Sequence, residues 1–148
     1  MALYAIADLH LSLGTDKPMD VFRGWENYVE RLEKNWRALV TAEDTVVVAG
    51  DISWGMRLEE TVRDFAFLES LPGKKLLLKG NHDYWWSTRS KIESFFAAQG
   101  FRSMEIVFNS AVRVGDIAVC GTRGWLYNAE TAEDKTVSYT HLTLPTIR

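Results

Sequence analysis

The sequence predicts an α/β domain built on a parallel β-sheet. Segments with strand character alternate three times with segments of helical periodicity, and three further short strands follow. The runs Thr45–Ala49 (TVVVA) and Lys75–Lys79 (KLLLK) have continuously apolar centres, which is typical of strands buried on both faces. Parallel strands joined by helices form right-handed crossovers, whereas the turn residues Gly115–Asp116 predict an antiparallel hairpin further along the chain.

The first half of the chain is expected to contain two strands and two helices. Leu3–Ala7 is a short apolar run that predicts the first strand. From Trp25 onward, apolar residues recur every three or four positions, which predicts an amphipathic helix with Asp20 as a candidate cap. Thr45–Ala49 is the second strand. Leu58–Leu71 is the second helix, because its apolar residues form one stripe and a Pro-Gly pair follows it.

The second half begins with Lys75–Lys79 as the third strand. Ser87 is expected to cap a third helix, which Gly100 ends. Three short strands then follow: Ile106–Phe108, Ala111–Val114 and Ile117–Cys120.

Composition and charge limit the classes of partner. Of the 148 residues, 47% are apolar and 25% are charged, values typical of a globular domain and not of a disordered or collagen-like chain. A formal net charge of −3 provides no broad basic surface, so we expect neither nucleic acid nor a membrane as a partner. Cys120 is the single cysteine and the N-terminus lacks a basic leader, and both features favour a cytoplasmic protein.

The segment Val137–Arg148 (VSYTHLTLPTIR) differs from the rest of the chain. It is rich in threonine, has no acidic residue and shows no helical periodicity. It resembles the translation of an adapter used to prepare sequencing libraries, the alternative being an ordinary frayed terminus. We therefore predict that the natural sequence covers residues 1–136 and that residues 137–148 are a non-native tail.

Polar side chains directly follow each of the first three predicted strands. They form the segments Asp8–His10, Gly50–Asp51 and Gly80–Asp83. The carboxyl ends of parallel strands lie at one edge of a sheet, so we expect the three segments to converge there. Their carboxylates, imidazoles and amide suit a divalent ion such as Mn²⁺, Fe²⁺, Zn²⁺ or Mg²⁺. Taken singly, each segment could equally be turn or capping chemistry.

This series of motifs (D-x-H, G-D and G-N-H-D) resembles that of the calcineurin-like metallophosphoesterase superfamily. The resemblance covers about residues 3–125 and looks like the small bacterial phosphohydrolases. It implies an α/β fold in which a β-sandwich of two sheets is flanked by helices (αββα), with metal ions at the strand ends. On this basis, residues 1–136 are the N-terminal part of a single metallophosphoesterase domain, truncated at its C-terminus.

The resemblance also implies a set of metal ligands. Asp8 and His10 would bind the first ion, Asp51 would bridge both ions, and Asn81 would bind the second through its amide oxygen. The cofactor is therefore expected to be a pair of divalent ions, Mn²⁺, Fe²⁺ or Zn²⁺.

The same resemblance assigns catalytic roles to the residues after Asn81. His82 would stand beside the metal ions, stabilise the phosphate transition state and protonate the leaving oxygen. Asp83 would either orient His82 or hold the turn. The reaction would be hydrolysis of a small phosphate ester by a hydroxide activated by two metal ions. The alternative is a metal-binding, non-catalytic interaction module.

Two later motifs of the superfamily are missing from the chain. Gly-His and Gly-His-x-His normally supply three more imidazole ligands, but beyond His82 the sequence has only His141, in the segment interpreted as an adapter. We therefore expect two ions in the full-length protein, whereas this chain would hold one ion weakly and hydrolyse poorly.

Aromatic side chains also follow the second and third strands. Tyr84–Trp86 come after His82, and Trp54 comes after Asp51. They could wall a substrate pocket or pack between loop and helix, and the sequence leaves both alternatives open.

Overall fold

The computed structural model describes residues 1–122, and its central element is a four-stranded parallel sheet. The strands lie in the order β1 (Leu3–Ile6), β2 (Thr45–Val48), β3 (Lys74–Leu77) and β4 (Met104–Ile106). Each pairing is parallel, with Ala5 opposite Val47 and Val47 opposite Leu76. This order brings the carboxyl ends of all four strands to one edge of the sheet.

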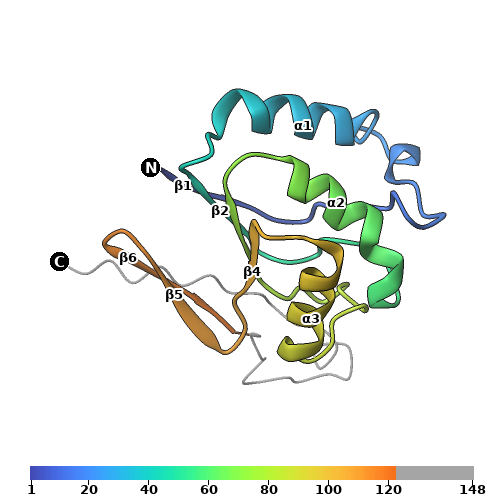
Figure 1. The fold of residues 1–148 in the computed structure, drawn as a ribbon. Helices are drawn as coiled ribbons and strands as arrows, with labels where there is room; N and C mark the ends of the chain where they lie inside the picture. Colours follow the sequence, from blue (N-terminus) through green and yellow to red (C-terminus); the bar gives the residue numbers. More distant parts are fainter. Residues whose placement is uncertain (123–148) are drawn as a thin grey trace, which may run out of the picture.

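Three α-helices cover one face of this sheet: α1 (Tyr28–Leu39), α2 (Val62–Ser70) and α3 (Arg89–Gln99) (Figure 1). Two 3-10 turns, η1 (Met19–Val21) and η2 (Leu58–Thr61), precede α1 and α2. Trp36, Phe65 and Ile92 come from one helix each and share a buried cluster with Val46 and Val48 of β2. Alternate residues of the strand therefore face the helices, as a pleated strand requires.

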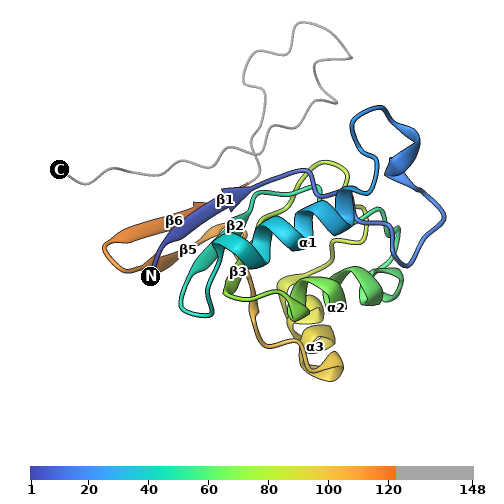
Figure 2. The same cartoon turned by 90° about the horizontal axis from the view of Figure 1, so that it is seen from above.

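A two-stranded antiparallel hairpin lies on the opposite face of the parallel sheet (Figure 2). It consists of β5 (Ser110–Val114) and β6 (Ile117–Gly121), joined by a two-residue turn at Gly115–Asp116. Val119 of β6 packs in a second buried cluster with Val47 and Leu76. The predicted α/β fold is confirmed, but the antiparallel strands form a separate second sheet and do not continue the parallel one.

The start of α1 differs from the prediction. The helix begins at Tyr28, because Asn27 adopts a left-handed backbone with a φ of 51°. Trp25 continues the apolar spacing of the helix but precedes it. The predicted cap Asp20 is wrong, since this residue lies within the 3-10 turn η1.

Two boundaries in the second half also differ. The N-cap of α3 is Thr88, not the predicted Ser87, because the Thr88 carbonyl accepts the first helical hydrogen bond. Strand β4 runs over Met104–Ile106 and not over the predicted Ile106–Phe108. Its pairing with β3 sets this range, with Met104 opposite Lys75.

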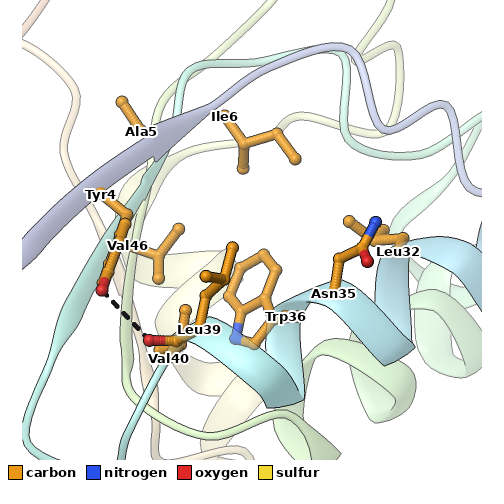
Figure 3. Close-up of a pocket in the computed structure, with 9 residues that line it drawn as sticks. All are labelled: Tyr4, Ala5, Ile6, Leu32, Asn35, Trp36, Leu39, Val40 and Val46. Atoms are coloured by element: carbon orange, nitrogen blue, oxygen red, sulfur yellow. Dashed lines mark hydrogen bonds between the residues drawn. The ribbon is translucent and has the colours of Figure 1, made fainter.

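An apolar pocket of about 230 Å³ lies between β1 and α1 (Figure 3). Tyr4, Ile6 and Trp36 contribute to its walls, and the Tyr4 hydroxyl donates a hydrogen bond to the carbonyl of Leu39 (3.1 Å). Within residues 1–122, no helix combines the length and the apolar character that crossing a membrane requires. The predicted tail, residues 137–148 with His141, lies outside the described residues.

Candidate metal centre

The segments that follow β1 and β2 run side by side beyond the ends of the two strands. The backbone N–H of His10 donates to the carbonyl of Asp51 (2.9 Å), and Leu11 and Ser53 form a further parallel bridge. The backbone thus extends the β1–β2 pairing and fixes His10 next to Asp51.

Two glycines let the segments after β2 and β3 touch backbone to backbone. A Cβ atom on Gly50 would lie only 2.6 Å from the Cα of Gly80, and Gly50 also has a φ of 106°, which other residues rarely adopt. A Cβ atom on Gly80 would collide with the carboxylate of Asp51. Both glycines are therefore needed for the third segment to reach Asp51.

The polar side-chain atoms of His10, Asp51 and His82 meet at this edge of the sheet. Their candidate ligand atoms all lie within 4.8 Å of one another. His82 Nδ1 lies 3.0 Å from Asp51 Oδ2, and His10 Nε2 lies 3.9 Å from the same oxygen. The other carboxylate oxygen of Asp51 accepts the backbone N–H of His82 (2.8 Å). Asp51 is buried and forms the centre of this cluster.

Two further residues predicted as ligands border the cluster. Asp8 Oδ1 lies 3.7 Å from His10 Nε2, and the Asp8 side chain is 65% exposed. Asn81 Nδ2 lies 3.1 Å from His82 Nδ1. The structure therefore groups His10 and Asp51 with His82, places Asp8 next to His10, and places the Asn81 side chain against its neighbour His82.

The backbone of this group has an unusual conformation. Asp8, His10 and Asp51 have left-handed φ values of 57°, 43° and 52°. Such a conformation costs an L-residue roughly 1–2 kcal/mol, although Asp and His tolerate it better than most residues do. Backbone strain of this kind persists where the surrounding structure enforces it, and it gathers at functional sites.

Asp83 is buried beside the cluster, and its carboxylate joins the segments after β2 and β3. One oxygen accepts the N–H groups of Asp51 (2.9 Å) and Gly80 (2.8 Å), and the other accepts those of Ile52 (2.8 Å) and the Trp85 indole (3.0 Å). Burial raises the pKa of Asp83; the N–H groups oppose that shift, and the charge of Asp51 adds to it. These contacts favour the second predicted alternative for Asp83, in which it holds the turn.

Asp64 of α2 is a second buried carboxylate near the site, and the sequence analysis did not single it out. It accepts hydrogen bonds from the Ser53 hydroxyl and from the Leu13 N–H (2.8 Å), so it links the segments after β1 and β2. Burial raises the pKa of Asp64. Asp64 shares helical spacing with the inward-facing Leu68 and Leu71. An acidic residue on the otherwise apolar, inward-facing side of the helix is the signal in the sequence that could have revealed Asp64.

The aromatic side chains divide between the two predicted alternatives. Trp85 is buried and packs edge-to-face on Phe65, with 5.0 Å between ring centroids, and Trp86 packs on Trp85. Tyr84, which is 53% exposed, contacts His82 with its ring instead. Trp54 stands beside the imidazoles. Packing therefore accounts for two of these residues, whereas Trp54 and Tyr84 border the cluster.

The donor set fits a divalent metal ion. Imidazole nitrogens and carboxylate oxygens without thiolate are the donors that Mn²⁺, Fe²⁺ and Zn²⁺ accept. A cation would also offset the cost of keeping the Asp51 carboxylate out of water. The apolar pocket between β1 and α1 shares no residue with the cluster, so it is not the place for this chemistry.

Comparisons with known proteins place the chain in a family. Among solved structures, a protein of unknown function from Aquifex aeolicus has a similar fold, with a TM-score of 0.50 and 18% identity over 92% of this chain and 69% of that chain. A phosphopantetheinyl hydrolase from Mycobacterium tuberculosis matches with a TM-score of 0.40 and 19% identity over 70% of this chain and 34% of that chain. No curated protein matches. The family model described as calcineurin-like phosphoesterase matches residues 1–145, and the chain belongs to that family.

Proposed function

We propose that this protein is a metal-dependent hydrolase of small phosphate esters. The observation that carries the proposal is the convergence of His10, Asp51 and His82, from three separate segments, at the carboxyl edge of the parallel sheet. Membership of the calcineurin-like phosphoesterase family supports the same reaction class.

Four side chains would hold the metal ions. Asp8 and His10 would bind one ion, Asn81 would bind a second, and the central position of Asp51 suits a bridging ligand. When bound, two divalent ions supply a nucleophile from water at neutral pH and offset negative charge on the phosphate. Within the described residues the first ion would have more ligands than the second, which supports the expectation that this chain holds a single ion, and holds it weakly.

His82 would act on the substrate itself. Its side chain is 39% exposed, so a phosphate ester can reach it, and Asp51 Oδ2 lies 3.0 Å from its Nδ1 and orients the ring. The imidazole would donate a hydrogen bond to a phosphoryl oxygen and a proton to the leaving oxygen. Asp83 would contribute indirectly, by fixing the turn that carries His82.

A substitution of His82 tests this assignment. We expect His82→Ala to lower hydrolysis of an aryl phosphate in the presence of Mn²⁺ by roughly 100- to 10,000-fold, the range for a lost proton donor. Calorimetry should find the Mn²⁺ affinity within a few-fold of the unsubstituted chain, because His82 is assigned to the substrate and not to the metal.

Two results would contradict the proposal in different ways. A His82→Ala variant that no longer binds Mn²⁺ would make His82 a metal ligand. Slow hydrolysis is expected of this chain, so the alternative, a metal-binding interaction module, is favoured if the unsubstituted chain binds Mn²⁺ yet hydrolyses phosphate mono- and diesters no faster than His82→Ala does.

A further inference from the structure

Trp54 lies against both imidazoles of the cluster. Its ring stacks on His10, with 4.9 Å between ring centroids and 23° between ring planes. The same ring contacts His82, with 5.2 Å between centroids and a tilt of 50°. The two imidazoles are themselves 5.8 Å apart. One indole thus contacts two rings whose nitrogens face Asp51.

Trp54 is also held in place by contacts with residues other than the two histidines. The Trp54 backbone N–H donates to the Leu11 carbonyl (2.8 Å), which ties Trp54 to the segment after β1. Its ring N–H donates to Met19 Sδ (3.3 Å). Lys17 Nζ lies over the ring, 5.3 Å from its centroid. The plane of the indole is therefore set by neighbours other than the imidazoles.

We propose that Trp54 is a positioning residue that sets the ring planes of His10 and His82 toward Asp51. Trp54 offers no ligand atom itself and acts through the two imidazoles. His10, the imidazole assigned to the metal, binds a cation only along the direction of its nitrogen lone pair, so a ring free to rotate about its χ angles loses entropy when it binds, and His82 loses entropy in the same way when it meets the substrate. A fixed indole removes that cost in advance. This role rests on the proposed function, since it serves one imidazole assigned to the metal, His10, and one assigned to the substrate, His82.

Variants of Trp54 separate positioning from general packing. We expect Trp54→Leu to weaken Mn²⁺ binding about 10- to 100-fold by calorimetry, the range for residues that orient metal ligands. Trp54→Phe keeps a flat ring and should restore most of the affinity. Trp86→Leu is the matched control, because Trp86 packs on Trp85 and Phe108 and not on an imidazole. It should lower the urea midpoint and leave Mn²⁺ affinity unchanged.

A second measurement does not depend on metal or activity. In metal-free protein, ring-current shielding from the stacked indole should move the His10 ring protons upfield in NMR spectra, and Trp54→Leu should remove most of that shift, leaving the part from Trp25, whose ring centroid lies 6.1 Å from that of His10. The role is overturned if Trp54→Leu binds Mn²⁺ as tightly as the unsubstituted chain, or if Trp54→Phe is as impaired as Trp54→Leu. If the unsubstituted chain binds Mn²⁺ but hydrolyses esters no faster than His82→Ala does, the proposed function fails. The Mn²⁺ affinity and the His10 chemical shifts would still test the role of Trp54.

Discussion

The two ends of the parallel sheet hold their charged side chains under opposite conditions. At the amino end, Lys75 is fully buried, and its ammonium donates to the Leu71 carbonyl and the Ser103 hydroxyl. Glu69 accepts the N–H (3.1 Å) and the hydroxyl (2.6 Å) of the same Ser103. Asp44 accepts the N–H groups of Ala2 and Thr41, which hold its pKa below the usual value. Each charge there has fixed polar partners.

At the carboxyl end, the polar groups face one another. His10 and His82 both approach the same carboxylate oxygen of Asp51, and three residues of the group have left-handed backbone. The conformational preferences of single residues favour neither the shared carboxylate oxygen nor the left-handed backbone. The amino end is therefore arranged so that its charges are satisfied within the fold, whereas the carboxyl end keeps donors grouped at a cost that a bound cation would offset.

Removal of the central carboxylate should have the largest effect. We expect Asp51→Asn to lower hydrolysis and Mn²⁺ affinity by more than about 1000-fold, since residues that merely orient ligands already account for 10- to 100-fold. The metal-free variant should unfold at a urea concentration close to that of the unsubstituted chain, because Asn keeps the shape and tolerates a left-handed φ. Calorimetry and urea unfolding measure the two effects.

Asp44→Asn at the amino end is the matched control for that variant. It should lower the free energy of unfolding slightly, because a neutral amide replaces the carboxylate that accepts the Ala2 and Thr41 N–H groups. Its Mn²⁺ affinity should not change. If Asp44→Asn weakened metal binding, or if Asp51→Asn mainly destabilised the fold, the division between the two ends would be wrong.

Asp83 combines features of both ends. It lies at the carboxyl end, but its carboxylate accepts several backbone N–H groups, as that of Asp44 does at the amino end. We expect Asp83→Ala to lower the free energy of unfolding by about 3 kcal/mol even without metal, since it leaves several N–H groups without their acceptor. Urea unfolding of metal-free protein measures this loss. An equal midpoint for the variant would show that Asp83 serves the chemistry and not the turn.

The sequence was informative where a single physical cause dominates. Thr45–Val48 is buried at every position, and such a strand reads as one apolar run. The polar segments at Asp8, Asp51 and Asn81 directly follow strands, and the parallel order alone is enough to bring them to one edge. These elements could be predicted because the burial of a strand and the order of strands in a sheet do not depend on specific side-chain contacts.

Other features depend on contacts between segments far apart in the sequence. Trp25 fits the apolar spacing of α1, yet the helix begins only at Tyr28, because Asn27 has a left-handed backbone. Asp64 is buried only because Ser53 and Leu13 arrive from two other segments. The left-handed backbone at His10 follows from its pairing with the segment after β2. None of these causes is local, so sequence patterns could not show them.

The smallest expected effect concerns the pH dependence of stability at the amino end. Burial lowers the pKa of Lys75 from 10.5 to about 8, with the charge of Glu69 opposing the shift. Folded protein therefore releases this proton more readily than the unfolded chain, so the free energy of unfolding should rise with pH between about 8 and 10.5. We expect a rise on the order of 2 kcal/mol. Urea unfolding at several pH values measures it.

Lys75→Met should abolish that rise, because the variant has no ammonium to deprotonate. Lys74→Met is the matched control, since Lys74 is the exposed neighbour of Lys75 and pairs with Glu105 at 2.6 Å. The control should keep the rise. A Lys75→Met variant whose stability climbs with pH in parallel with the unsubstituted chain would show that another group causes the rise and that the contacts with Leu71 and Ser103 compensate the buried ammonium in full. Full compensation would strengthen the contrast between the two ends, because every charge described at the amino end would then be satisfied by fixed polar partners.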